Sequence, residues 1–379
     1  MKTYKILKIL GVEIGDLIRI FYRNNQTLKT LAYDEHFHFL KNLVPVHFNH
    51  FAEEMRNLGH ECNEVIYDLE LLQKSWANEN GVQFGWHSWK LDILMEQIRF
   101  YRPEIIYLQN LEPMPFWLLQ RIKEIFPFVR KILAFKGNLP NRVHELKGVD
   151  YVFAGHPAIL EDCQESEVSC ELFYHCFDER VLSLLAEWEL SNQPDSHPFA
   201  FIGYSGFGGY GNCHNERYEL LKRLFVDTDI SIWTSEGSNL PNSDLPANSK
   251  PLFVEYPERC RKGVFGLPLF SIIKNSEIVF NKHAEICKGN IGNMRLFETT
   301  GVGSCLLTDT GSNMSDLFVA DEEVVTYASY EELIEKLRHL SENESARKAI
   351  ALAGQKRTLK DHSLKLRCEQ ISEALRKIL

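Results

Sequence analysis

Residues 289–309 constrain the possible fold more than any other stretch of the chain. They read GNIGNMRLFETTGVGSCLLTD: small polar residues, a short helical segment, two glycines and a buried strand at 305–308. A loop, a helix and a strand in so few residues are typical of a crossover in an α/β protein. The free amides at such a helix start, reinforced by the helix dipole, favour a bound phosphate.

Four residues of this stretch are candidate ligand contacts. We expect the amides of Gly292 and Asn293, together with the Arg295 guanidinium, to lie against a diphosphate. The carboxylate of Glu298 is placed to accept hydrogen bonds from two hydroxyls of a ribose. The alternative, which the residues alone leave open, is an ordinary capped helix with a surface glutamate.

The length and rhythm of the chain predict two domains. A chain of 379 residues is too long for one compact core. Its first half alternates short apolar strands with amphipathic helices, which indicates a mostly parallel sheet covered on both faces. Residues 187–198, EWELSNQPDSHP, are polar and contain proline, so we expect a domain linker there. The α/β pattern then starts afresh.

Composition excludes several classes of protein. Apolar residues make up 44% and charged residues 25%, as in an ordinary soluble globular protein. A net charge of −10 argues against a nucleic-acid partner. The nine cysteines show no metal-ligand spacing, and an odd number in a chain of this size indicates reduced thiols and a cytoplasmic location. No secretory signal is visible, and no apolar run reaches the ~18 residues that a membrane span needs.

The second half opens on a strand at 199–202 that leads into a glycine-rich turn at 203–211. Gly203, Ser205 and Gly206 would let backbone amides approach a diphosphate, although such turns also serve as plain connections. Arg217 falls in the first turn of the next helix, a poor place for a cation unless an anion lies nearby. A solvated arginine is the alternative. A buried strand at 278–280 then leads into Asn281 and His283.

The sequence SEIVFNKHAEICKGNIGNMRLFETTGVGSCLLTDTGSNMSDLFVADEEVVTYASYEEL resembles the donor-binding half of a GT-B glycosyltransferase. It is similar to the group-1-like branch that includes spore-maturation-protein-type glycosyltransferases. The resemblance is specific over residues 199–362 and looser at 33–36, 55–60 and 73–81. It implies two Rossmann-like domains facing each other across a cleft: an acceptor-side domain at 1–190 and a nucleotide-sugar-binding domain at 191–362. A C-terminal helix at 363–379 would pack on the first domain.

The resemblance also implies roles for single residues. Glu298 matches the glutamate that holds the donor ribose. Asn290 stands where many relatives have a second glutamate that touches the donor sugar; an amide there binds hydroxyls without a charge. Asn281 and His283 look like the Asn-x-His element of the branch, and a satisfied loop histidine is the alternative.

The implied function is transfer of a sugar from a nucleotide-diphosphate-sugar donor to the hydroxyl of a glycan, lipid-linked or protein acceptor. It would belong to the synthesis of cell-surface glycans or glycoconjugates. The implied enzyme is a metal-independent, hexosyltransferase-type glycosyltransferase with no cofactor besides the donor, since we find no suitably placed Asp-x-Asp pair.

Catalysis would depend on groups that stabilise the departing phosphate, for which Arg217, Arg295 and His283 are candidates. Asp34, Glu35 and His50 are candidates for a base that takes the acceptor proton. Two alternatives use the same scaffold, because a fold does not determine a function. They are a nucleotide-sugar epimerase and a non-catalytic protein that binds nucleotide-sugar.

Overall fold

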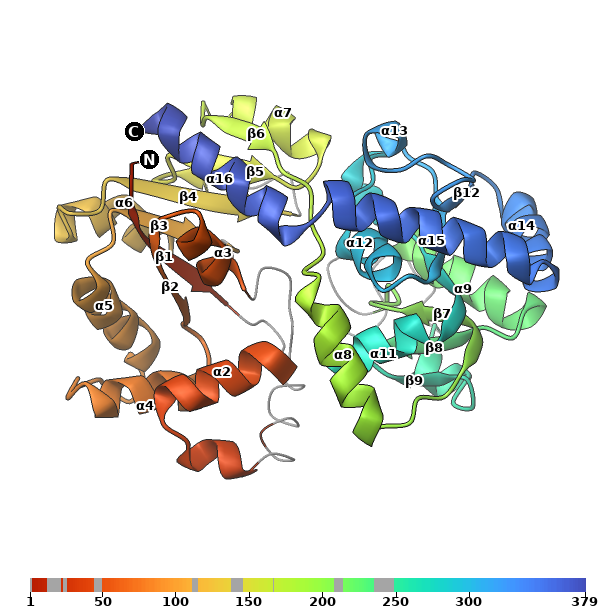
Figure 1. Cartoon of the computed structure of the whole chain (residues 1–379), viewed down its shortest axis with the longest axis horizontal. Helices are drawn as coiled ribbons and strands as arrows, with labels where there is room; N and C mark the ends of the chain where they lie inside the picture. The colour runs from red at the N-terminus through yellow and green to blue at the C-terminus, as the bar shows by residue number, and fades with distance from the viewer. Residues whose placement is uncertain are drawn as a thin grey trace. The chain divides into compact units, whose positions relative to one another are not determined.

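The computed structural model describes residues 2–11, 22, 26–43, 50–110, 115–137, 146–165, 167–207, 214–234 and 249–379. The chain forms two compact units, which are shown in Figure 1. The first unit comprises Met1–Gly155, Ile159–Phe173 and Arg367–Leu379, and the second comprises His156–Ala158 and Tyr174–Leu366. Over the described ranges, no helix combines the length and the apolar character that a bilayer crossing requires.

The first unit is built on a six-stranded sheet in the order β2-β1-β3-β4-β5-β6, in which every pairing is parallel. β1 lies inside the sheet, with Ile6 opposite Cys62 on one side and Ile105 on the other. The strands are β1 Lys5–Leu10, β2 Glu61–Ile66, β3 Ile105–Leu108, β4 Lys131–Lys136, β5 Tyr151–Ala154 and β6 Cys170–Leu172.

Helices cover both faces of this sheet. One face packs against α5, α6 and α7, and the other packs against α3, where Phe51 stacks on Tyr107 with ring centroids 5.0 Å apart. The end of α16 also belongs to this unit, because Ser372 Oγ lies 2.9 Å from His60 Nε2. The helices are η1 Gln26–Thr30, α2 Tyr33–Leu43, α3 Phe51–Asn57, α4 Glu70–Glu79, α5 Trp89–Tyr101, α6 Phe116–Ile125, α7 Pro157–Glu165 and α16 Leu364–Ile378.

The second unit repeats the architecture with a sheet in the order β12-β11-β10-β7-β8-β9, again with every pairing parallel. The expected α/β class with two parallel sheets is therefore confirmed. The strands are β7 His197–Ile202, β8 Ser231–Thr234, β9 Cys260–Lys262, β10 Ser276–Asn281, β11 Cys305–Asp309 and β12 Val325–Tyr327.

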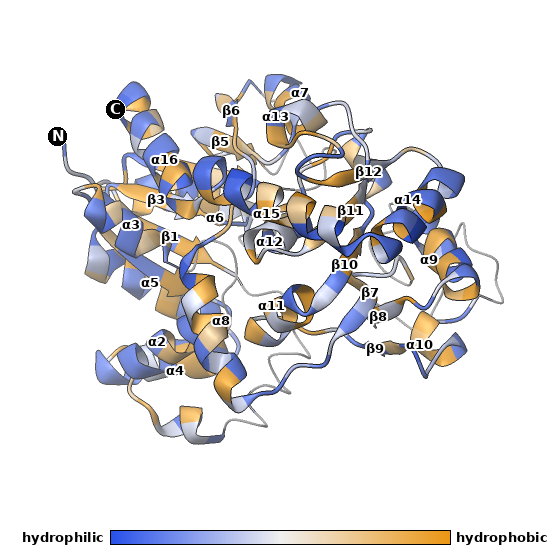
Figure 2. Ribbon diagram, turned by 45° about the vertical axis from the view of Figure 1, so that its right-hand side comes forward, coloured by the Kyte–Doolittle hydropathy of each residue, from blue (hydrophilic) through white to orange (hydrophobic). Residues whose placement is uncertain are grey.

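The apolar core of the second unit lies between this sheet and helices α9 and α14. Figure 2 shows hydrophobic residues along the strands and on the helix faces turned toward them. Helix α14 has a side-chain N-cap, since Ser329 accepts the Glu332 amide at 3.2 Å. The helices are α8 Arg180–Ser191, α9 Asn215–Asp227, α10 Leu252–Glu255, α11 Leu267–Lys274, η3 Glu285–Cys287, α12 Met294–Gly301, α13 Met314–Leu317, α14 Tyr330–Glu342 and α15 Glu344–Asp361.

The units divide after Phe173, earlier than the linker that we expected at 187–198. Residues 187–191 instead complete helix α8, which packs on α11. The Glu189 carboxylate binds this helix. It accepts hydrogen bonds from Ser271 at 2.9 Å and Asn275 at 2.8 Å and pairs with Lys274 at 2.6 Å. This part of the stretch therefore makes a helix contact, and residues 174–190 belong to the second unit.

Candidate functional site

A cavity of about 380 Å³ lies at the carboxyl ends of β10, β11 and β12 in the second unit. Parallel α/β sheets bind their ligands at this edge. The lining residues follow these strands or belong to the start of α9 and the loop before α12: Glu216, Lys282, His283, Ala284, Glu285, Gly289, Asn290, Asp309, Thr310, Tyr327 and Ala328.

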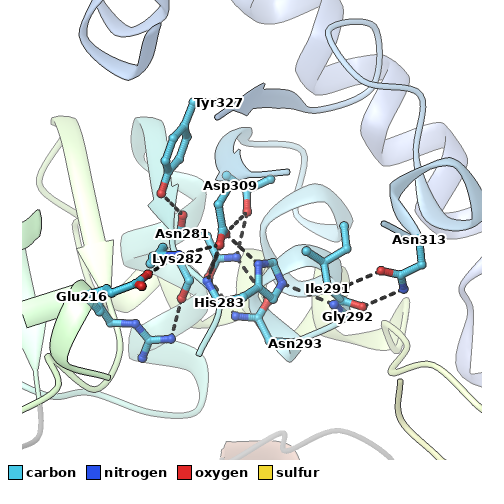
Figure 3. A network of polar contacts seen from close by, with 12 residues as sticks. Glu216, Asn281, Lys282, His283, Ile291, Gly292, Asn293, Asp309, Asn313 and Tyr327 are labelled. Atoms are coloured by element: carbon cyan, nitrogen blue, oxygen red, sulfur yellow. Dashed lines mark hydrogen bonds and ion pairs between the residues drawn. The ribbon is translucent and has the colours of Figure 1, made fainter. Parts of the chain in front are cut away.

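A chain of hydrogen bonds runs from Asp309 through His283 to Gly292 (Figure 3). The Asp309 carboxylate accepts the His283 backbone amide at 3.0 and 3.2 Å and lies 2.7 Å from ring Nδ1. On the other side of the ring, Nε2 lies 3.3 Å from the Gly292 amide nitrogen. The His283 side chain is therefore buried and bonded at both ring nitrogens.

Charge is concentrated around the Lys282 ammonium, which lies 3.2 Å from the Asp309 carboxylate and 3.4 Å from that of Glu216. Burial raises the pKa of Asp309, but hydrogen bonds from His283 and the charge of Lys282 outweigh it, and the net change is downward. Burial lowers the pKa of Lys282, whereas the two carboxylates raise it, and the net change is upward. Asp309 and Lys282 are thus both charged at neutral pH.

The loop at 289–293 is fixed by side chains from the two neighbouring strand ends. Asn313 accepts the Ile291 amide at 2.8 Å and donates to the Ile291 carbonyl at 2.9 Å. Asn281 and Asn293 exchange side-chain hydrogen bonds of 2.9 and 3.3 Å. These two amide pairs, with the His283 contact, hold three consecutive loop residues.

The beginning of the loop is held by the segment after β11. The Ser312 amide donates to the Gly289 carbonyl at 3.0 Å, and its hydroxyl donates to Asn290 Oδ1 at 2.9 Å. Gly311 approaches so closely that an added Cβ would lie 2.5 Å from the Ile291 side chain. Every residue from 289 to 293 therefore has a partner near the end of β10 or β11.

Helix α12 begins directly after this loop with an uncapped first turn. Asn293 is its N-cap but makes no side-chain cap bond, because its amide group is bonded to Asn281. Arg295 Nη1 lies 2.7 Å from Glu298 Oε2 as an ion pair. These two buried atoms and Arg295 Nε make no well-aligned hydrogen bond within the described part of the chain. The first amides of the helix are open by helix geometry, whereas these atoms of the pair are buried and the pair does not line the cavity.

We expected the Gly292 amide to contact phosphate, but it donates its hydrogen bond to His283 Nε2. The amides that remain open by helix geometry are those that follow it, at the start of α12.

The glycine-rich turn after β7 differs more from expectation. The Gly203 amide donates to the Trp233 carbonyl at 2.9 Å, and the Ser205 amide donates to Thr234 Oγ1 at 3.0 Å. Gly206 has φ 103°, and an added Cβ would lie 2.3 Å from the His214 carbonyl oxygen. These residues therefore serve a tight turn, while residues 208–211 of the predicted phosphate loop lie outside the described residues.

Arg217 is buried, and its guanidinium faces the protein backbone. One Nη atom donates to the Tyr204 carbonyl at 3.0 Å and the other to the Lys282 carbonyl. The side chain thus joins the segments that follow β7 and β10. This contact explains a cation in the first turn of α9 without a bound anion.

We expect Arg217→Gln to reduce stability rather than to remove a diphosphate contact. Each buried carbonyl left without a donor costs about 1–3 kcal/mol. Urea denaturation measures this loss, and Arg223→Gln is a matched control on the same helix, where the side chain is 57% exposed. Unchanged stability, with a selective loss of affinity for a nucleoside diphosphate over the nucleoside, would contradict this interpretation.

The three expected base candidates belong to the first unit, whereas the other candidates belong to the second. Asp34 and Glu35 are exposed in the first turn of α2, where the helix dipole stabilises negatively charged side chains. His50 is buried directly before α3.

Sequence reasoning missed Lys282, Asp309 and Asn313, which organise the site. Their signal is positional: Lys282 directly follows β10, Asp309 is the last residue of β11, and Asn313 lies in the segment after β11. The register that sets Asn281 opposite Thr308 brings these residues together, and only the structure provides it.

Comparison with known proteins gives one family match and several solved structures of similar fold. Residues 217–373 match the model of a family described as glycosyl transferase-like, a range that includes the fixed loop and α12. No curated protein sequence matches the chain significantly.

Solved structures of similar fold cover nearly the whole chain. Anabaena HepE in complex with UDP-glucose has a TM-score of 0.60 at 10% identity, covering 99% of this chain and 100% of its own. Sucrose-phosphate synthase from Thermosynechococcus elongatus has a TM-score of 0.58 at 10% identity, covering 99% of each chain. The α,α-trehalose 6-phosphate synthase from Burkholderia multivorans has a TM-score of 0.56 at 9% identity, covering 100% of this chain and 99% of its own. The chain shares the GT-B fold of these glycosyltransferases.

Proposed function

We propose that this protein is a glycosyltransferase that moves a sugar from a nucleoside-diphosphate donor to an acceptor hydroxyl. The observation that carries the proposal is the fixed loop at 289–293, which leads into an uncapped helix start with the buried Arg295–Glu298 pair in its first turns. Two findings support it. The glycosyl transferase-like match spans this element, and the similar Anabaena protein was solved with UDP-glucose. We also propose that the chain belongs to the spore-maturation-protein-type branch, because Asn281 and His283 resemble its Asn-x-His element.

The donor would bind along the start of α12. The helix amides and Arg295 would hold the diphosphate, because the dipole and the guanidinium both favour an anion there. Glu298 would accept the ribose hydroxyls. Asn290 lines the cavity, and one of its two amide hydrogens is donated to the Cys287 carbonyl, which leaves the other for a sugar hydroxyl.

In the transfer, the bond from the anomeric carbon to the phosphate oxygen breaks and a bond to the acceptor oxygen forms. The nucleoside diphosphate leaves with the electron pair, and the acceptor hydroxyl loses its proton. Fixed positive groups at the departing phosphate are the largest expected contribution. We keep His50, Asp34 and Glu35 as proposed groups for the proton. As the acceptor we propose a glycan, lipid-linked or protein hydroxyl in cell-surface glycan or glycoconjugate synthesis.

We further propose that transfer needs no divalent metal and no cofactor besides the donor, because α12 and Arg295 supply positive charge where the diphosphate would leave. We therefore expect the same rate of donor turnover in excess EDTA as in buffer with Mg²⁺. Loss of turnover in EDTA that Mg²⁺ or Mn²⁺ restores would contradict this.

A panel of nucleosides, nucleoside diphosphates and nucleotide-sugars tests the function. A ligand that binds only the folded protein stabilises it by RT ln(1 + [L]/Kd), so a tighter ligand at the same concentration raises the melting temperature more. The selected donor is then incubated with and without acceptor material. Donor consumption that depends on acceptor supports a transferase. Isomerisation without acceptor would indicate an epimerase, and binding without turnover would indicate a sensor.

A further inference from the structure

We infer that Asp309 is a positioning residue, which acts through His283 to hold the loop at 289–293 in its binding conformation. The inference deepens the proposed function, and its ligand-binding arm rests on that function. Neither residue needs to touch the donor.

The first step is the tautomer of His283. An ionised carboxylate only accepts hydrogen bonds, so the 2.7 Å contact with Asp309 requires a proton on Nδ1. A neutral imidazole then has a lone pair on Nε2. The Gly292 amide can only donate, and it lies 3.3 Å from this nitrogen. The two contacts therefore select the same tautomer.

The second step is what His283 cannot do in this arrangement. A doubly protonated ring would direct an N–H at the Gly292 N–H, and two donors cannot bond to each other. With Nε2 accepting the Gly292 amide, the same lone pair is not available for a substrate proton. His283 thus links a strand end to a loop, rather than serving as the catalytic base or phosphate contact that its position in the sequence suggests.

The third step is the effect on the loop. Gly292 has φ 145°, a conformation that side-chain-bearing residues rarely adopt. The His283 contact holds this peptide between the Ile291 and Asn293 contacts. The next amides open helix α12. Losing the correct tautomer would release the peptide that directs these amides toward a diphosphate.

The test uses full-length protein labelled with ¹⁵N in histidine and in the backbone, without ligand. We expect His283 to carry its proton on Nδ1, and the signal is assigned by its absence in His283→Gln. Asp309→Asn should mix the tautomers and shift the Gly292 amide resonance, because an amide can donate to Nδ1 as well as accept from it. Glu216→Gln is the matched control. It removes another carboxylate that lines the cavity but makes no contact with His283, so the tautomer should not change.

The second arm is calorimetric titration with UDP. We expect Asp309→Asn to weaken UDP binding on the order of tenfold, because the charge-assisted contact between Asp309 and His283 that orders the loop is lost. A proton on Nε2 in the wild-type protein would overturn the inference, and this measurement needs no variant to fold. An unchanged tautomer and unchanged Gly292 resonance in Asp309→Asn would also overturn it. If the tautomer changes as expected but the wild-type protein binds neither UDP nor any other nucleoside diphosphate, the proposed function fails and the positioning role stands.

Discussion

Glu298→Ala should weaken the binding of a nucleoside diphosphate by roughly 10- to 150-fold, which corresponds to about 1.5–3 kcal/mol for hydrogen bonds to a charged group. Its carboxylate is largely buried beside Arg295, and Oε2 has no well-aligned hydrogen bond in the described residues. We expect two ribose hydroxyls to donate to this carboxylate. Isothermal titration with UDP, and with uridine as the shorter ligand, measures the change.

The control must separate loss of the ribose contact from loss of the ion pair. Glu277→Gln removes a carboxylate that lies 2.9 Å from Arg347 in the same unit, away from the loop. We expect it to leave UDP affinity unchanged. A second variant, Arg295→Gln, should weaken UDP more than uridine, because a guanidinium favours the diphosphate. Unchanged affinity in folded Glu298→Ala protein would show that this residue only pairs with Arg295.

Deleting residues 367–379 should unfold the first unit while the second keeps its sheet. Cys368, Ile371 and Leu375 at the end of α16 are each at most 2% exposed, and this segment belongs to the first unit. Burial of one large aliphatic side chain contributes about 1.5–3 kcal/mol, against a total stability of about 5–15 kcal/mol for a typical domain. Hydrogen exchange should therefore show lost protection in β1 to β6 and retained protection in β7 to β12.

Single substitutions in α16 measure its contribution to the stability of the first unit on a smaller scale. Leu375→Ala should cost about 2–5 kcal/mol, as expected for a fully buried leucine. Glu373→Ala, on the exposed side of the same helix, should stay within about 0.5 kcal/mol of the parent. Nucleoside diphosphate binding should persist in the deletion variant and acceptor-dependent turnover should be lost. Retained protection in β1 to β6 of that variant would show that α16 is not needed for the fold of the first unit.

The elements with strong apolar periodicity were predictable from the sequence. Helix α9 has Arg217 in its first turn as expected, and Tyr218, Leu221 and Phe225 form a clear inward stripe. Helix α15 has no such stripe. Its buried positions are Arg347, Ala351, Gly354 and Thr358, so the residues at helical spacing on its inner face are small or polar. A method that looks for apolar periodicity cannot find such a helix.

The short edge strand β9 was missed for a related reason. Only Cys260 of its three residues is buried, so it carries no strand pattern of its own. Its identity comes from pairing with β8, which is a property of the sheet and not of the segment.

The candidate site was predictable as a region but not as a network. Polar residues after buried strands indicated the carboxyl edge, and His283 and Asp309 are 26 positions apart in sequence. Their contact depends on the register of β10 against β11. The roles of the glycines were also ambiguous from the sequence. Gly206 is needed for the approach of the His214 carbonyl, which composition alone cannot distinguish from the approach of a phosphate.

The fixed loop at 289–293 also determines when conformational entropy is lost. Ordering the backbone of one residue costs about 1–2 kcal/mol at room temperature. Here Asn281, His283, Ser312 and Asn313 order the loop as the second unit folds, before any ligand arrives. A donor that binds an ordered loop does not have to offset this entropy from its own contacts. The affinity of the site then reports the contacts of the donor itself, and a substitution that frees the loop would lower affinity without removing any of them.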